Sequence, residues 1–366
     1  MIKHAVLGIA ALIALAAYAP AQTRDAKTLD IYIADTEGGK AVLFVSPGGQ
    51  TALVDTGFPG ARDTDRITAM LTEAGVKRLD YLIATHYHLD HVGGLQELAK
   101  RFPVGTYVDH GPTLEAREQV AGFQEAYAQL HAAAKHLVVK AGDRLPLAGV
   151  DWRIVTSAGE AIKKPLPGGG IANPACADFK KHEEPASPDD NNASVGSVMT
   201  YGRFRLLDLA DLLWNKEGEL MCPTNPIGTV DIYMASNHGS ANAGSAALVH
   251  AARPRVAIMQ NGTRKGASVQ AFEILEQSPG LEDVWQLHWS YNGGIEHNAP
   301  GVFIANVDDA AAIANVLTAP AAAGRGGGGN ATAAHSPAYY LKISAQSDGS
   351  FTITNTRNQF SKTYRK

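Results

Sequence analysis

A stretch of eleven residues, ATHYHLDHVGG, contains four side chains that can bind a metal ion: His86, His88, Asp90 and His91. Imidazole nitrogens and carboxylate oxygens are both ligands of zinc-like divalent cations, at about 2.0–2.2 Å. In an extended segment, residues two apart point the same way, so His86 and His88 can bind one ion. Asp90 and His91 follow a turn and can face a second ion. The spacing predicts a metal site rather than a polar loop.

The elements on either side of this stretch must hold the ligands in place. The apolar run Leu79–Thr85 predicts a strand that leads directly into them. After them, apolar residues repeat at helical spacing from Leu95 to Phe102, and Pro103 ends the helix. We expect the pair Gly93–Gly94 to let the backbone turn sharply between strand and helix.

The rest of the chain predicts two β-rich halves with helices between them. Strands are predicted at Leu29–Asp35, Ala41–Ser46, Thr51–Gly57, Gly105–Asp109, Leu137–Lys140, Trp152–Thr156, Val195–Tyr201, Phe204–Leu209, Val230–Ala235 and Arg255–Gln260, and a hairpin follows Pro337. Helices are predicted at Ile67–Ala74, Leu114–Lys135 and Leu213–Met221. This order indicates an α/β fold in which two packed sheets carry helices on their outer faces.

The N-terminus has the pattern of a signal peptide. Residues 1–21 combine a basic start, a short apolar run and an Ala-Pro-Ala cleavage site, and the run is shorter than the ~20 residues of a spanning helix. We expect residues 22–366 to form one exported domain, periplasmic or secreted, without a stable membrane span. Within it, residues 159–191 are interpreted as an insertion, and the Gly/Ala-rich residues 319–337 as a loop.

Composition and charge limit the partners. The 366 residues are 45% hydrophobic, and 32 basic against 36 acidic residues give a net charge of −4, with no basic run longer than a pair. Duplex nucleic acid is therefore excluded as a partner held by charge, whereas a small molecule or a short phosphodiester fits. The two cysteines, Cys176 and Cys222, can form one disulfide or remain separate thiols, and the sequence leaves both open. The oligomeric state is equally open.

The metal-binding stretch resembles the signature of the metallo-β-lactamase superfamily, and other segments extend the resemblance. LLDLADLLWNKE resembles the family element whose aspartate bridges two metals, which implies that role for Asp211. IYMASNHGS resembles the element that supplies the last ligand, His238, and ALVDTG resembles the strand that ends beneath the metal loop at a supporting Asp55. Together these segments look most similar to the hydrolase-like domain of the competence protein ComEC, without its membrane segments. The resemblance implies an αββα sandwich of two mixed β-sheets.

One family element departs from the common pattern. Many members place a histidine between the two halves, where this chain has PDDNNASVGS. Oxygens of Asp190, Asn191, Asn192 or Ser194 are expected there instead, and His110 is expected at the border of the pocket. In QNGTRKG, Asn261, Arg264 and Lys265 are further residues that can face an anionic substrate, with an ordinary polar loop as the alternative.

The resemblance implies an exported metal-dependent hydrolase, with two Zn²⁺ expected and Mn²⁺ as an alternative. A metal-bridging hydroxide would attack the substrate, Asp211 would orient it, and Asp90 would pass a proton to the leaving group. A phosphodiester-type substrate is slightly preferred. The alternatives are a lactone, thioester or β-lactam hydrolase of the same fold, an iron-dependent oxidoreductase, and a non-catalytic binding protein.

Overall fold

Two nine-stranded β-sheets pack face to face in the computed structural model, which describes residues 28–132, 134–184, 186–294, 296–307 and 338–366. The first sheet has the strand order β20-β19-β18-β1-β2-β3-β4-β5-β6. The second has the order β17-β16-β15-β14-β12-β11-β8-β7, with β9 paired to β8. Both sheets are mixed, because parallel and antiparallel neighbours occur in each.

The central strands of both sheets are short and apolar, as expected for strands with both faces covered, whereas the edge strands β6 and β20 contain exposed residues. Those of the first sheet are β1 (Thr28–Ile33), β2 (Val42–Val45), β3 (Thr51–Val54), β4 (Leu79–Ile83), β5 (Val104–Asp109), β6 (Lys135–Val138), β18 (Leu341–Gln346), β19 (Phe351–Asn355) and β20 (Ser361–Tyr364). Those of the second are β7 (Arg144–Leu145), β8 (Asp151–Ser157), β9 (Glu160–Ala161), β11 (Gly196–Tyr201), β12 (Phe204–Asp208), β14 (Ile232–Met234), β15 (Val256–Met259), β16 (Asp283–His288) and β17 (Ile304–Asn306). A separate pair joins β10 (Ile171–Ala172) to β13 (Thr224–Asn225).

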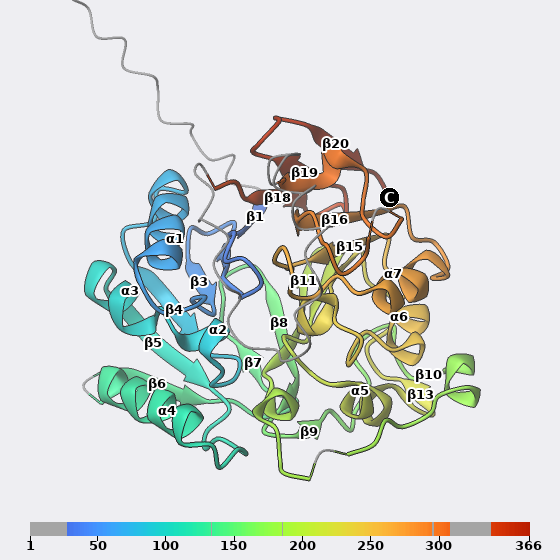
Figure 1. The fold of residues 1–366 in the computed structure, drawn as a ribbon, viewed down its shortest axis with the longest axis horizontal. Coiled ribbons are helices and arrows are strands. Elements are labelled where there is room, and N and C mark those ends of the chain that lie inside the picture. The colour runs from blue at the N-terminus through green and yellow to red at the C-terminus, as the bar shows by residue number, and fades with distance from the viewer. Residues whose placement is uncertain (1–27, 133, 185, 295, 308–337) are drawn as a thin grey trace, which may run out of the picture.

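Helices cover the outer face of each sheet (Figure 1). The first sheet carries α1 (Ala61–Glu73), α2 (Leu89–Val92), α3 (Leu95–Arg101) and α4 (Glu118–His131), and the second carries α5 (Trp214–Met221), α6 (Ala246–Ala252) and α7 (Val269–Glu276). Three apolar clusters follow from this arrangement: one between the sheets and one under each helical layer. Between the sheets, the rings of Phe44 and Trp152 meet edge to face at 4.7 Å. The predicted αββα fold is confirmed.

The C-terminal hairpin completes the first sheet. Strand β18 pairs antiparallel with β1, so that β1 has a neighbour on each side. The hairpin of β18 and β19 was expected from the sequence, but its pairing with the first strand was not.

Several element boundaries differ from the predictions. The helix predicted at Leu114–Lys135 begins only at Glu118 and ends at His131. Its expected first residues are held elsewhere, because Leu114 N and Thr113 Oγ1 both donate hydrogen bonds to Asp190 Oδ1, at 2.8 and 2.7 Å. Its expected last residue, Lys135, begins strand β6.

The segment interpreted as an insertion contains little regular structure. Besides β9 and β10, its described residues contain a short 3₁₀ helix, Pro174–Ala177, and the start of a second one, Asp190–Ala193. A disulfide between Cys176 and Cys222 joins this segment to the end of α5 and resolves the alternative that the sequence left open. The expected signal peptide and the Gly/Ala-rich residues 319–337 lie outside the described residues. Among those that are described, no helix is long and apolar enough to cross a membrane.

Candidate metal centre

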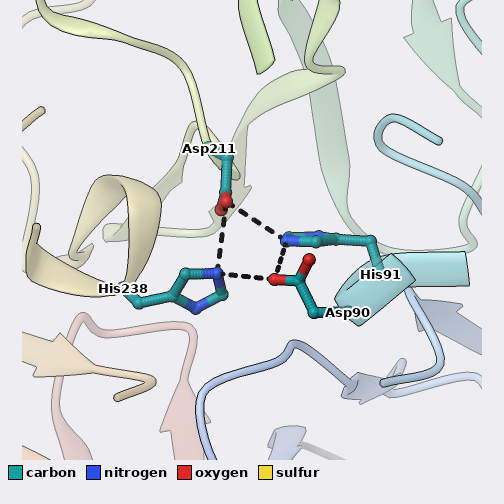
Figure 2. A group of neighbouring side chains, drawn as sticks. All are labelled: Asp90, His91, Asp211 and His238. Atoms are coloured by element: carbon teal, nitrogen blue, oxygen red, sulfur yellow. Dashed lines mark hydrogen bonds and ion pairs between the residues drawn. The ribbon is translucent and has the colours of Figure 1, made fainter. Parts of the chain in front are cut away.

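Four buried side chains converge at one end of the two sheets: Asp90, His91, Asp211 and His238 (Figure 2). His91 Nε2 lies 3.2 Å from Asp90 Oδ2 and 3.3 Å from Asp211 Oδ2. His238 Nε2 lies 3.2 and 3.1 Å from the same two oxygens. Two imidazole nitrogens and two carboxylate oxygens thus alternate around a common centre. This is the donor set and ligand number of a four-coordinate zinc-type site.

Loops that follow three strands place these side chains. Asp90 and His91 lie in α2, directly after the loop that leaves β4. Asp211 follows β12 through Ala210, whose backbone is left-handed with φ 50°. His238 follows β14 and has φ 57° itself. Left-handed backbone is uncommon for residues other than glycine, and two such residues beside one cluster indicate a geometry imposed by the site.

The glycine pair after His91 has a different role from the one predicted. Gly93 and Gly94 have φ of −62° and −86°, which any residue can adopt. However, a Cβ on Gly93 would lie 2.3 Å from Pro59 N, and one on Gly94 would lie 2.3 Å from Thr56 O. The two glycines therefore allow residues 86–94, called the metal loop below, to pack directly against the segment after β3. Gly93 and Gly94 do lie in a turn, between α2 and α3, but its φ angles do not require glycine.

The two histidines of the cluster are oriented by hydrogen bonds from their second ring nitrogen. His91 Nδ1 lies 2.8 Å from Asp55 Oδ2, and His238 Nδ1 lies 3.1 Å from the carbonyl oxygen of Gln260. Both acceptors favour the tautomer with hydrogen on Nδ1, which leaves the Nε2 lone pair directed into the cluster. Metal-binding histidines are commonly fixed in this way. The environment of Asp55 fits the supporting position inferred from the family resemblance.

The electrostatics of the cluster favour a bound cation. Burial alone would raise the pKa of Asp90, but Lys265 and His91 hold it well below its ordinary value. Burial would likewise raise the pKa of Asp211, and His238 and His91 lower it well below the ordinary value. Conversely, burial would lower the pKa of His91, yet the nearby carboxylates raise it well above normal. Without an ion, Lys265 and the two histidines are the positive partners of these buried carboxylates, and a divalent ion can replace the protons of the histidines in that role.

A sequence model of the family described as the Metallo-beta-lactamase superfamily matches residues 35–243, which include all four residues of the cluster. The chain belongs to this superfamily. In this metallo-beta-lactamase superfamily protein, the buried His/Asp cluster is a metal site.

Individual relatives are more distant. A segment of 100 residues is 36% identical to Coenzyme F420H(2) oxidase from Methanothermobacter marburgensis, and it covers 27% of this chain and 23% of that protein. The chain therefore spans less than a quarter of the length of that relative. A metallo-beta-lactamase variant from Cronobacter sakazakii is 15% identical, with 56% of this chain and 75% of that chain covered and a TM-score of 0.33. CmlA, a diiron beta-hydroxylase from Streptomyces venezuelae, is 17% identical, with 63% and 44% covered and a TM-score of 0.36.

His86 and His88, the first two histidines of the metal loop, lie beside the four-residue cluster. The ring of His86 lies 4.0 Å from that of His91 and 4.7 Å from that of His88. His86 Nε2 is buried and has no hydrogen-bond partner among the described residues, while its Nδ1 lies 3.2 Å from Thr85 Oγ1. A buried imidazole nitrogen without a partner is costly unless it binds an ion or water. His86 therefore fits a ligand position beside the four-residue cluster.

His88 is engaged by a residue that the sequence did not single out. Its Nε2 lies 2.8 Å from Glu115 Oε2 and 3.9 Å from Asp189 Oδ1. Glu115 is itself buried, accepts a hydrogen bond from Asp190 N and forms an ion pair with Arg117. Because Glu115 occupies Nε2, the second nitrogen of His88, Nδ1, remains for a metal.

The residues expected to replace the missing histidine divide into two groups. Ser194 Oγ accepts a hydrogen bond from Asp211 N at 3.3 Å, so Ser194 supports the cluster through the backbone. The Oδ1 atoms of Asn191 and Asn192 are buried without a hydrogen-bond partner in the described part of the chain. Of the expected replacements, these two amide oxygens are the ones free to accept a water or an ion.

The remaining expected pocket residues differ in their distance from the chemistry. Lys265 Nζ contacts Asp90 Oδ2 and is 38% exposed, so it lies at the open side of the cluster. His110 is buried against Asp190, with Nε2 3.4 Å from Oδ2, and is not in contact with the four cluster residues. Asn261 is buried and donates to the carbonyl oxygens of Gly262 and His288, which makes it a support for the loop after β15.

A buried ion pair behind Asp211 was also missed from the sequence. Lys40 Nζ lies 2.5 Å from Asp208 Oδ1, and the same oxygen accepts a hydrogen bond from Ala210 N at 3.0 Å. Lys40 N donates to the carbonyl oxygen of Asp90 at 3.0 Å. One lysine therefore connects the loops that carry Asp90 and Asp211. The only signal in the sequence was a lysine immediately before an apolar strand.

Proposed function

We propose that this protein is an exported metal-dependent hydrolase, with two Zn²⁺ in the site, or Mn²⁺ in their place, and a phosphodiester-type substrate. The observation that carries the proposal is the ring of Asp90, His91, Asp211 and His238, with His86 and His88 beside it. Bound divalent ions would supply a water of lowered pKa and polarise the substrate oxygen. The ComEC-like pattern of the segments supports a phosphodiester.

The chain's own residues would position the reactants. Asp211 takes part in two of the four contacts of the ring, with Nε2 of His91 and of His238, and we assign to it the orientation of the attacking water. Asp90 is the second carboxylate of the ring, and we assign to it the transfer of a proton to the leaving group. Burial of all four residues excludes bulk water from the reacting atoms.

Cationic side chains at the rim support an anionic substrate. Lys265 is partly exposed and its ammonium group contacts Asp90 Oδ2. With a metal bound to Asp90, that ammonium group becomes available to a substrate phosphate. Arg117 Nη2 lies 3.2 Å from His88 Nε2, and the arginine side chain is 61% exposed. Two cations around one metal centre favour a phosphoryl group over a neutral lactone.

An activity screen tests the proposal. The mature chain is stripped of metal, reloaded with Zn²⁺, Mn²⁺ or Fe²⁺, and assayed with bis-p-nitrophenyl phosphate, a lactone, a thioester and a chromogenic cephalosporin. We expect metal-dependent turnover of the phosphodiester that the Asp211→Asn variant lacks. Turnover of only the lactone, thioester or cephalosporin would replace the substrate class. Absence of metal-dependent turnover with the whole panel would favour a binding protein.

An iron-dependent oxidoreductase is the second candidate, because the relative at 36% identity is an oxidase. The diiron flavoproteins place a carboxylate where this chain has His88, which favours zinc or manganese here. However, Glu115 brings a carboxylate to within 2.8 Å of His88. Metal analysis of protein purified from its own host separates the two candidates. Bound iron together with metal-dependent oxygen consumption would favour the oxidoreductase.

The proposed export rests on the N-terminal pattern and on the cysteines. The disulfide between Cys176 and Cys222 supports an oxidising compartment, where such bonds persist. Expression with the native leader, followed by mass spectrometry, tests the cleavage. A periplasmic or secreted chain that begins at Gln22 is expected. A chain with intact Met1 in the membrane fraction would indicate an anchor instead.

A further inference from the structure

A second group of metal-binding side chains lies at the corner where α4 meets the edge of the first sheet. It consists of Asp109 at the end of β5, His131 at the end of α4 and His136 in β6. One ligand atom from each lies within 4.8 Å of the others. None of these residues belongs to the candidate metal centre or contributes to the proposed function.

The sheet register brings the carboxylate and one imidazole together. Strands β5 and β6 are parallel, with Tyr107 paired to His136. Asp109 is two residues after Tyr107, so its side chain projects from the same face of the sheet. As a result His136 Nε2 lies 2.5 Å from Asp109 Oδ2.

The helix end adds the second imidazole. The ring of His131 stacks on that of His136 with centroids 3.7 Å apart and planes inclined by 20°. The ring of Tyr127, one helical turn earlier, meets His131 edge to face at 5.0 Å. The two imidazoles are thus held side by side by a helix and a strand, rather than placed on one flexible loop.

The group combines a fixed, buried carboxylate with access from solvent. Asp109 is 1% exposed, and its Oδ1 accepts a hydrogen bond from Gly111 N at 2.7 Å, which leaves Oδ2 for the histidines. The side chain of His136 is 29% exposed, so an ion can reach the group from the surface. A simple ion pair with Asp109 would use one imidazole, whereas this arrangement presents two.

We propose that Asp109, His131 and His136 form a second, structural site for a divalent late transition metal, with Zn²⁺ as its natural occupant. The two imidazoles are borderline ligands that suit zinc, copper or nickel better than magnesium or calcium, and a carboxylate is a common third ligand of zinc. Water completes the coordination on the exposed side. The ion joins β5, β6 and the end of α4 at one point.

This site also connects to the loop of the candidate metal centre. Gly111, whose N–H is held by Asp109, accepts a hydrogen bond through its carbonyl oxygen from Tyr87 OH at 3.0 Å. Tyr87 lies between His86 and His88. An ion at Asp109 therefore stiffens the residues against which the metal loop packs, without supplying a ligand to it.

Metal stoichiometry tests the second site independently of catalysis. The chain from Gln22 to Lys366 is freed of metal with a chelator and dialysed to equilibrium against buffered Zn²⁺. The amount of zinc bound per chain is then measured. We expect His136→Ala to bind one equivalent fewer than the wild type. The control is His182→Ala, because His182 stacks on Trp214 outside any of the metal-binding groups found here. The control should bind as many equivalents as the wild type.

A second variant and a folding check guard against loss of structure. His131→Gln removes only the stacked ring and should lose the same equivalent, and far-UV circular dichroism should match that of the wild type for both variants. Equal zinc content in the wild type, both variants and the control would overturn the proposal. Hydrolytic inactivity of the wild type would contradict the proposed function, but the difference in zinc content would remain.

Discussion

Asp55 Oδ2 accepts the Nδ1–H of His91 at 2.8 Å, and both side chains are completely buried. The same carboxylate accepts hydrogen bonds from Thr85 N and Thr85 Oγ1, at 2.8 and 2.7 Å. It therefore joins the end of β3 to the loop after β4 and fixes the imidazole that points into the cluster. Asp55 itself has a left-handed backbone, with φ 61°.

We expect Asp55→Asn to weaken metal binding without unfolding the protein. The amide keeps the size of the carboxylate but removes the charge that holds the hydrogen of His91 on Nδ1. A fraction of the His91 rings then carries the hydrogen on Nε2 instead, and these rings have no lone pair for the metal. Loss of such an outer hydrogen bond typically costs about 10–100-fold in metal affinity. Competition with a chromophoric chelator measures the change. Asp65→Asn, at an exposed position, is the control, and equal affinity in both variants would contradict the role of Asp55.

Asp211→Asn should abolish hydrolysis while the protein remains folded. Asp211 contacts His91 and His238 at once, and its negative charge is the one that two neighbouring ions would share. Turnover is measured beside circular dichroism. We expect a loss of about 10²-fold or more, as for essential groups around a metal. Activity above about a tenth of the wild type would show that Asp211 does not bridge.

Stepwise chelation should reveal two metals of unequal affinity. The tight one is held by Asp90, His91, Asp211 and His238, a full set of four protein ligands. The looser one has His86 and His88 and a share of Asp211. We expect activity to fall with the first ion that leaves, His88→Ala to lose only that ion, and His238→Ala to lose the tight one. Simultaneous release of both ions, or full activity with one, would contradict the scheme.

Glu115→Gln should weaken the looser ion alone. Glu115 Oε2 accepts from His88 Nε2 and so fixes which nitrogen of His88 faces the metal. A neutral amide can rotate to donate instead, and the imidazole then loses its preferred tautomer. Zinc titration of the wild type and the variant measures both affinities. An unchanged weaker affinity, or an equal loss at both sites, would show that Glu115 does not act through His88.

Stability should depend on pH through a carboxyl that is not one of the four cluster residues. Glu217 is completely buried, and this burial raises its pKa from 4.5 to about 7, although Gly244 N and Ser245 N donate to it. Between pH 4.5 and about pH 7 the folded chain binds more protons than the unfolded chain. The contribution to stability is therefore fully present below about pH 4.5 and is lost as the pH rises through 7.

The corresponding experiment compares urea unfolding of the wild type and Glu217→Gln across this pH range, in the presence of a chelator. The difference between 7 and 4.5 is about 2.5 pKa units, so the wild type should lose on the order of 3 kcal/mol relative to the variant. Replacement of Glu217 by glutamine changes the free energy of unfolding by an amount that does not depend on pH. If the free energies of unfolding of the two proteins changed in the same way with pH, Glu217 would not have the raised pKa.

The sequence predicted the parts of the site that are local or that resemble the family. His86, His88, Asp90 and His91 lie in one loop, so their spacing alone indicated a metal. Asp211 and His238 were inferred from the resemblance. In the structure Asp211 Oδ2 lies 3.3 Å from His91 Nε2, and His238 Nε2 lies 3.2 Å from Asp90 Oδ2. Many strand positions were predictable because these strands are apolar and lie between turn residues, but β16 and β17 were not predicted.

The supporting contacts could not be predicted, because they join residues far apart in the chain. Glu115 lies in a segment whose composition favours helix, and only the hydrogen bonds to Asp190 show why the helix starts later. Lys40 reaches Asp208 across the two sheets. Gly93 was misread because a glycine can serve either a positive φ or a close contact, and the sequence does not distinguish them.

The position of β1 between β2 and β18 has a consequence for the order of folding. One neighbour of β1 follows it immediately in the chain, whereas the other belongs to the last described segment. The first sheet therefore stays incomplete during synthesis until the C-terminal hairpin has emerged. Pairings over such long separations form slowly, because the intervening chain must be closed into a loop first. Completion of the first sheet is therefore expected to be a late and slow step of folding.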